Sequence, residues 1–269
     1  MKINSGKQHR PRRVLLYGDN GIGKTTLAAS WPKPIIINLE DGCGDVECDK
    51  TERLTTEADV VGAISWLIQN KHDYRTIVVD SADWLERCIF QAVAQAQGKK
   101  TIEEIGFGKG YESAAKHWQY VIDALTHLWQ AGLHIVFTAH LHIAKFANPA
   151  GDSYNYYQPA LHDKGSSILL DWCDEILFLT TRVDTRTEES GFGNRRSFAI
   201  GGTERIIYTS EAASHVAKNR CGMPPVLPMS AAELAKYMEP PKPAGNVAGI
   251  VVDGSSKGAS VRTEVKNGN

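Results

Sequence analysis

The chain has 269 residues, of which 42% are apolar and 23% are charged, and its formal net charge is −1. These proportions are typical of a globular protein with a buried core, and the length fits one large α/β domain with appendages or at most two domains. The balanced charge excludes an overall field that attracts nucleic acid, so any such binding must come from local patches.

Secretion and membrane insertion are both disfavoured. The first residues lack the apolar run of a signal peptide, and no apolar stretch approaches membrane-spanning length. Five cysteines without a Cys-x-x-Cys pair disfavour a disulfide framework or a zinc site. We therefore expect a soluble cytoplasmic protein without a membrane partner.

Residues 1–13 form a basic arm without any acidic residue. It contains Lys2, Lys7, Arg10, Arg12 and Arg13. An arm of this kind is suited to touching phosphates, and it is equally typical of a solvated, flexible terminus. Both interpretations stay open from the sequence.

Residues 14–30 combine a strand, a glycine-rich loop and the start of a helix. Four apolar or aromatic residues lead into G-x-x-x-x-G-K-[ST], the spacing of the phosphate-binding loop. The glycines let the backbone curl around a polyphosphate with its N–H groups pointing inward. We expect Lys24 to reach the β- and γ-phosphates and the Thr25 hydroxyl to bind Mg²⁺. The predicted nucleotide-binding residues are Gly18, Asp19, Asn20, Gly21, Ile22, Gly23, Lys24, Thr25 and Thr26.

Three further apolar strands are predicted in the first half of the chain, at residues 35–39, 76–81 and 133–140. They are apolar throughout rather than alternating, which indicates burial on both faces and hence a parallel sheet covered by helices. Apolar residues at helical spacing and Gly132 as a C-cap predict helices at 58–70, 84–97 and 112–130.

The second half of the chain is more irregular. Residues 145–165 are polar, so we expect a long functional or mobile loop there. After it we predict a helix at 166–173, a strand at 175–181, an exposed hairpin tip at 182–196, strands at 197–200 and 205–208, and a helix at 231–238. The Pro-, Gly- and Ser-rich residues 239–269 are expected to be a disordered tail. The predicted organisation is the arm at 1–13, one domain at 14–238 and this tail.

Two of the predicted strands end in a carboxylate. Asp80 ends one strand where a second carboxylate is needed to hold Mg²⁺, usually through water; the alternative is an acid that only starts a turn. Glu40 follows another strand, where an acid is suited to orient the water that attacks ATP. Asp41 beside it is a competitor, but Glu40 comes first after the strand and has the longer side chain.

The order of these motifs resembles the core of RecA-like ATPases. The phosphate loop is followed by strands that end in Leu39-Glu40, Val79-Asp80-Ser81 and Thr138-Ala139-His140. That group includes recombinases, DnaB-type helicases and small phage-encoded ATPases that promote single-strand annealing, and the resemblance covers residues 12–228. It implies an α/β fold with a RecA-like P-loop NTPase core, a mostly parallel central sheet flanked by helices, and a C-terminal β extension before the tail.

Carried over to this sequence, the resemblance implies that Glu40 is the water-orienting base and Asp80 the acid associated with Mg²⁺. His140 falls where these families place a residue that senses the γ-phosphate, although Gln or Asn is more usual there. A metal pair of His140 and His142 is the alternative, but it lacks a third ligand in register. The implied cofactors are ATP and Mg²⁺.

Residues 216–224 resemble the Lys-x-Arg segment with which DnaB-type and RecA-type subunits reach into a neighbour's ATP site. Lys218 and Arg220 point the same way on an extended segment, because side chains alternate there. A cation delivered in trans stabilises the charge on the transferring phosphoryl group and ties hydrolysis to assembly. A solvated basic turn before Pro224 is the alternative.

The predicted loop at 145–165 resembles, by its position, the second DNA-binding loop of recombinases. Its stacking faces and cations are suited to single-stranded nucleic acid, although tyrosines are also common in loops without a ligand. The expected contacts are Lys145, Tyr154, Tyr156, Tyr157 and Lys164. The glycine-rich residues 106–111 are either a second contact or a packing or hinge segment.

The resemblance therefore implies a DNA-stimulated ATPase that binds single-stranded DNA and assists phage homologous recombination or strand annealing in the host cytoplasm. The implied partners are further copies of the chain, in a ring or filament with ATP sites at the subunit interfaces, and a single-strand-binding protein. A replicative helicase or helicase loader is one alternative. A slow-hydrolysing, nucleotide-controlled DNA-binding assembly protein is another.

Overall fold

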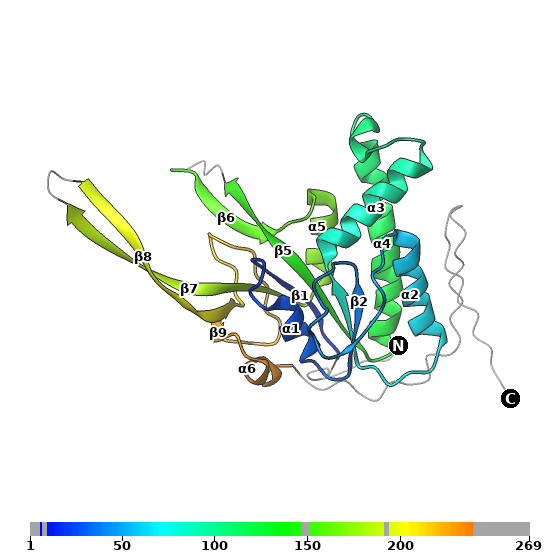
Figure 1. The fold of residues 1–269 in the computed structure, drawn as a ribbon, viewed down its shortest axis with the longest axis horizontal. Helices are drawn as coiled ribbons and strands as arrows, with labels where there is room; N and C mark the ends of the chain where they lie inside the picture. Colours follow the sequence, from blue (N-terminus) through cyan, green and yellow to red (C-terminus); the bar gives the residue numbers. More distant parts are fainter. Residues whose placement is uncertain (1–5, 7–9, 147–150, 191–193, 239–269) are drawn as a thin grey trace.

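The computed structural model describes residue 6 and residues 10–146, 151–190 and 194–238. The predicted tail and most of the predicted basic arm lie outside these residues. The described residues form a nine-stranded sheet with helices on both faces and two long antiparallel hairpins that project from it (Figure 1).

The sheet contains β1 (Arg13–Gly18), β2 (Pro34–Asn38), β3 (Asp49–Lys50), β4 (Thr76–Asp80), β5 (His134–Phe146), β6 (Tyr154–Pro159), β7 (Glu175–Ser190), β8 (Asn194–Tyr208) and β9 (Val226–Pro228). In space the order is β3-β2-β4-β5-β1-β7-β8-β9, and β6 pairs with β5 outside this path. The pairs from β3 to β7 are parallel, whereas β6, β8 and β9 join by antiparallel pairing. This arrangement confirms the predicted mostly parallel sheet.

The parallel strands are buried on both faces because successive apolar side chains enter different cores. In β1, Leu15 and Tyr17 belong to one cluster, and Val14 and Leu16 belong to the other, all with no exposed surface. The first cluster, here called the α4-side core, is the larger. The second is here called the α1-side core.

Helices cover each core. The α4-side core lies under α2 (Glu57–Gln69), α3 (Ala82–Ala96), α4 (Lys109–Gln130) and α5 (Asp163–Trp172), and the α1-side core under α1 (Lys24–Ala29) and α6 (Ala231–Ala235) (Figure 1). The predicted helices at 58–70, 84–97 and 112–130 correspond to α2, α3 and α4. None of the described helices combines the length and the apolar surface needed to cross a bilayer.

Two segments that we predict as loops are instead hairpins. The predicted loop at 145–165 is wrong over much of its length, because β5 runs on to Phe146 and pairs with β6. The predicted tip at 182–196 is also too long, because β7 reaches Ser190 and β8 starts at Asn194. In both segments the antiparallel ladder satisfies the backbone N–H and C=O groups, and the polar sequences lack the apolar pattern of a core strand.

The last two residues of the predicted basic arm are part of the fold. Arg13, which opens β1, makes two hydrogen bonds to Asp174, of 2.7 Å from Nη2 and 3.0 Å from Nε. Its guanidinium also lies 4.5 Å from the ring centroid of Trp129. Arg12 contacts Glu175 at 3.5 Å. These paired arginines fix the start of the central strand and are not free to touch phosphates.

Candidate functional site

Four parallel strands bring the predicted site residues to one edge of the sheet. β1 leads into the phosphate loop, Glu40 follows β2, and Asp80 ends β4. The register places Asn38 opposite Asp80 and Gly18 opposite His140 of β5. Residues that are far apart in the sequence therefore surround one loop.

The phosphate loop is held in shape by its glycines and by one buried anchor. Gly21 and Gly23 have φ angles of 73° and 106°, which side chains rarely allow. A Cβ on Gly18 would overlap the carbonyl oxygen of Leu179 in β7. Ile22 is buried in the α1-side core, whereas Asp19, Asn20 and Thr26 are exposed.

Lys24 lies over the loop rather than in an ion pair. Its Nζ donates hydrogen bonds to the carbonyl oxygens of Gly18 at 3.0 Å and Asp19 at 2.9 Å. Burial lowers the pKa of Lys24, and only 7% of the residue is exposed. Because both acceptors are neutral carbonyl groups, these hydrogen bonds leave the charge of the ammonium group unpaired and available to an anionic ligand.

Asp80 and Thr25 provide hard oxygen atoms beside the loop. Thr25 Oγ1 donates to Asp80 Oδ2 at 2.9 Å, and Thr138 donates to the other carboxylate oxygen. Asp80 is 3% exposed, and burial raises its pKa. A hydroxyl and a buried carboxylate in this position suit Mg²⁺, and a cation would stabilise the charged form of Asp80. Thr25 and Asp80 therefore fit the predicted metal.

His140 connects two carboxylates at the same edge. Its Nδ1 lies 2.8 Å from Asp83 Oδ2, and its Nε2 lies 3.4 Å from Glu40 Oε1. Its backbone N–H donates to the second oxygen of Asp83 at 3.1 Å, which fixes that carboxylate. The hydrogen bonds to Asp83 and Glu40 raise the pKa of His140 to about 9. His140 is therefore charged at neutral pH and restrains Glu40.

The contacts with His140 also keep both carboxylates in their charged form. The hydrogen bond from His140 lowers the pKa of Glu40 against the opposing effect of burial. Burial raises the pKa of Asp83, but the hydrogen bonds from His140 outweigh it and the pKa lies below its ordinary value. The backbone N–H of Glu40 donates to the carbonyl oxygen of Asp80 at 3.1 Å, so the acid is also held through its main chain.

Lys218 and Arg220 lie at the opposite edge of the sheet. Lys218 Nζ donates to two carbonyl groups at the end of α5, at 2.9 and 3.2 Å, and Arg220 pairs with Asp174 at 3.0 Å. Asp174 also binds Arg13, the first residue of β1. The phosphate loop follows Gly18, the last residue of the same strand. The six residues of β1 separate these edges, and a strand of that length spans about 17 Å. Neither cation therefore reaches the loop of its own chain.

The predicted nucleic-acid contacts separate into different surfaces. One face of the β5–β6 hairpin contains Phe146, Tyr154 and Tyr156, here called the hairpin patch. The ring centroid of Phe146 lies 5.1 Å from that of Tyr154 and 6.3 Å from that of Tyr156. Tyr157 is on the other face and packs 5.4 Å from Phe178. Lys145 is exposed next to the patch on that other face.

Lys164 does not belong to the hairpin. It lies in α5 and pairs with Glu112 of α4 at 3.6 Å. The stack of Tyr111 on His162, with centroids 4.0 Å apart, joins the same two elements near the glycine-rich residues 106–111. Packing of α4 against α5 accounts for these side chains.

Sequence reasoning missed Thr138, Asp83 and Phe146. Asp83 comes three residues after Asp80, and a second acid just past a strand end is a signal that would identify it. Thr138 precedes His140 by two residues and so lies on the same face of β5. Phe146 cannot be identified from the sequence, because no pattern there indicates that β5 continues beyond the parallel part of the sheet into a hairpin with β6.

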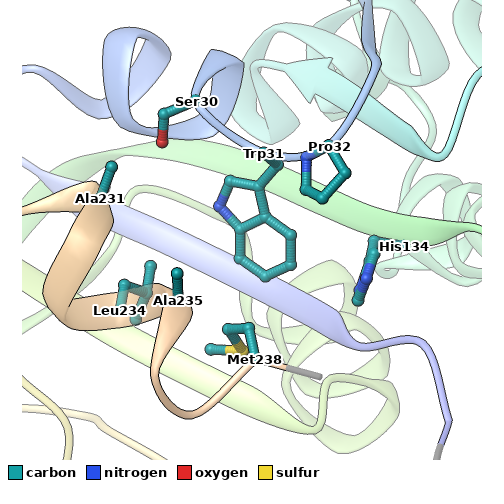
Figure 2. A pocket seen from close by; sticks show the side chains of 8 residues that line it. All are labelled: Ser30, Trp31, Pro32, His134, Ala231, Leu234, Ala235 and Met238. Atoms are coloured by element: carbon teal, nitrogen blue, oxygen red, sulfur yellow. The ribbon is translucent and has the colours of Figure 1, made fainter. Parts of the chain in front are cut away.

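A separate pocket of about 270 Å³ lies between the end of α1 and α6 (Figure 2). It is lined by Ser30, Trp31, Pro32, His134, Ala231, Leu234, Ala235 and Met238. Burial and the nearby Arg12 lower the pKa of His134 to about 4, so its imidazole is neutral at pH 7. His134 begins β5, which places the pocket at the edge away from the phosphate loop. This neutral, mostly apolar lining does not suit a polyphosphate.

A phosphate loop with carboxylates from neighbouring parallel strands defines a P-loop ATPase with a RecA-like core. The chain belongs to the AAA domain family, whose model matches residues 10–221. It is 25% identical over 133 residues to the SPbeta prophage-derived uncharacterized protein YorG of Bacillus subtilis strain 168. That alignment covers 47% of this chain and only 40% of the relative.

Among solved structures, the chain is similar to the flagellar accessory protein FlaH of Methanocaldococcus jannaschii. The sequence identity is 9% and the TM-score 0.30, over 74% of this chain and 85% of FlaH. The class assignment above comes instead from the loop, the strand order and the family match.

The charged state of His140 predicts a pH-dependent contribution to stability. Because folding raises its pKa from 6.5 to about 9, the stabilisation is complete below the unfolded pKa and is lost as the pH rises through the folded value. We expect the difference in free energy of unfolding between the wild type and His140→Gln to shrink by about 2 kcal/mol between about pH 6 and about pH 10, less than the full pKa change gives because solvent screens the partly exposed imidazole. Urea unfolding of both proteins across this range measures it, and a difference that stays constant with pH would contradict it.

Proposed function

We propose that this protein hydrolyses ATP with Mg²⁺ at the edge of its sheet, binds single-stranded DNA on the hairpin patch, and assists phage recombination or strand annealing. The observation that carries the proposal is the contact of His140 with Glu40 beside the phosphate loop, at 3.4 Å. A charged carboxylate held in that place is what ATP hydrolysis requires to orient the attacking water.

Each residue of the site has a distinct task in this proposal. Lys24 and the backbone of the loop bind the phosphates, and Glu40 orients the water. His140 restrains Glu40 and keeps it charged. Thr25 and Asp80 hold Mg²⁺, which when bound neutralises charge on the phosphate oxygens.

The hairpin patch supports the nucleic-acid part of the proposal. Phe146 is 45% exposed, and Tyr154 and Tyr156 lie beside it on a hairpin that projects from the sheet (Figure 1). Partly exposed aromatic rings can stack with unpaired bases, and Lys145, next to Phe146 but on the other face of the hairpin, adds a cation to the same hairpin. In a duplex the bases are already stacked on each other, so few of them are available to stack on these rings.

A phage setting is supported by the prophage-derived relative, although the two sequences match over less than half of either chain. Recombination and annealing act on single-stranded DNA, so they agree with the chemistry of the hairpin patch. A single-strand-binding protein that covers the same DNA is the corresponding partner in this proposal.

Assembly into a ring or filament is part of the proposal because of Arg220. Its side chain is 53% exposed at the edge of the sheet away from the phosphate loop of its own chain. A role of Arg220 and Lys218 in hydrolysis therefore requires the site of a neighbouring subunit. Release of Arg220 from Asp174 would accompany that contact.

The first test measures ATP hydrolysis with and without single-stranded DNA. We expect stimulation by DNA in the wild type, loss of nucleotide binding in Lys24→Ala, and turnover lowered about a hundredfold in Glu40→Gln with binding retained. Wild-type turnover in Glu40→Gln would rule out Glu40 as the base. Strand pairing that survives in Glu40→Gln would favour the slow-hydrolysing assembly protein, and ATP-driven unwinding would favour a helicase.

The second test addresses the hairpin patch. The double variant Tyr154→Ala, Tyr156→Ala should weaken binding of a single-stranded oligonucleotide about tenfold or more, because each lost stacking contact costs about 1–3 kcal/mol. Fluorescence anisotropy over a salt series measures this. Trp66→Ala removes an aromatic ring that is 50% exposed on α2 and serves as the matched control. Equal affinity of the wild type and the double variant would exclude the patch.

The third test separates a trans role of Arg220 from its ion pair with Asp174. Arg220→Ala alone should lose DNA-stimulated hydrolysis and retain ATP binding. Mixing it with Glu40→Gln should restore part of the activity, because some mixed interfaces then combine an intact Glu40 with an intact Arg220. A mixture as inactive as its components would contradict action in trans.

A further inference from the structure

Arg205 of β8 lies against the phosphate loop. A Cβ built on Gly23 would be 3.3 Å from Arg205 Nη1 and 3.0 Å from the terminal methyl group of Met229. Gly23 directly precedes Lys24, so the guanidinium group lies beside the part of the loop where phosphates bind. Nothing in the sequence around Arg205 indicates this position.

The fold fixes the backbone of Arg205 from both sides. It pairs with Thr181 across the β7–β8 ladder, and its carbonyl oxygen accepts a hydrogen bond of 2.9 Å from the N–H of Met229. Ile207, two residues further along β8, is buried in the α1-side core. Because side chains alternate along a strand, Arg205 points to the same face of the sheet as α1 and the phosphate loop.

The guanidinium group of Arg205 is available to a ligand. Arg205 is exposed, and its side chain has no hydrogen-bonding or ion-pair partner among the residues that the structure describes. Arg182 on the neighbouring strand differs, since it pairs with Glu204 at 2.8 Å. A free arginine beside a loop of backbone N–H groups is suited to bidentate contact with phosphate oxygens.

The flank on which Arg205 lies indicates which phosphates it meets. Glu40, Asp80 and His140 come from β2, β4 and β5, on one side of β1. Arg205 comes from β8, on the other side, where β7 separates it from β1. The γ-phosphate must lie toward Glu40 if that carboxylate orients the attacking water. The opposite flank then faces the rest of the nucleotide.

We propose that Arg205 binds, within its own chain, the phosphates that stay on the nucleotide after hydrolysis, so that it recognises the ADP part of ATP and ADP alike. This inference rests on the proposed nucleotide binding by the phosphate loop. In this proposal, Arg205 strengthens the binding of ATP and ADP equally. Residues on the side of the loop where Glu40 lies distinguish ATP from ADP.

The test is equilibrium binding of fluorescent Mg-ADP and of a non-hydrolysable fluorescent ATP analogue. Arg205→Ala should weaken both about tenfold or more and by the same factor, as expected for loss of a charged hydrogen bond. Arg205→Lys keeps the charge but loses the planar guanidinium group that makes bidentate contacts, so its affinity should fall between those of Arg205→Ala and the wild type. Arg182→Ala is the matched control on the adjacent strand and should bind both nucleotides like the wild type.

Two outcomes would overturn the assignment while the proposed function stands. Wild-type affinity of Arg205→Ala for ADP would remove Arg205 from the site, and weakened binding of the ATP analogue alone would move it to the γ-phosphate. A wild-type protein that binds neither nucleotide would overturn the proposed function itself, and this inference with it. Urea unfolding of Arg205→Ala and Arg205→Lys confirms that the compared proteins are folded.

Discussion

The site depends on the parallel register of the central strands. Gly18 lies opposite His140, and Asn38 lies opposite Asp80, so the ends of β1, β2 and β4 come together beside the middle of β5. A slip of one residue in any pair would turn its side chains to the other face and separate the carboxylates from the phosphate loop. The two cores, which take alternate residues of each strand, penalise such a slip on both faces.

The two edges of the sheet treat buried charge differently. Where the strands begin, each buried acid has an arginine partner from the chain itself: Asp174 pairs with Arg13 and Arg220, and Glu175 with Arg12, although burial still raises the pKa of Glu175 to about 7. Where the strands end, burial raises the pKa of Asp80 and lowers that of Lys24, so the charged form of each is disfavoured. A magnesium nucleotide supplies the cation for Asp80 and the anion for Lys24. The unbalanced edge is therefore the one suited to bind it.

The parts of the fold and site that the sequence predicts are those with a strong local signal. The phosphate loop is specified by spacing alone, and the acids at Glu40 and Asp80 by their position after buried strands. The network of Asp83, Thr138 and His140 depends on which strands become neighbours, and no local pattern encodes that. The hairpins are not predicted for a related reason, because antiparallel pairing can form without the continuous apolar run that marks a buried strand.

One strand physically connects the hairpin patch with the catalytic edge. β5 contains His140 within the sheet and Phe146 at the far end of the hairpin. Phe146 is six positions further along the strand than His140, which corresponds to about 20 Å. The N–H of Ala160, just after β6, also donates to the carbonyl oxygen of His140 at 2.8 Å. Both arms of the hairpin therefore converge on the residue that restrains Glu40. In the proposed DNA-stimulated hydrolysis, the hairpin patch and the residue that restrains Glu40 thus belong to one continuous strand.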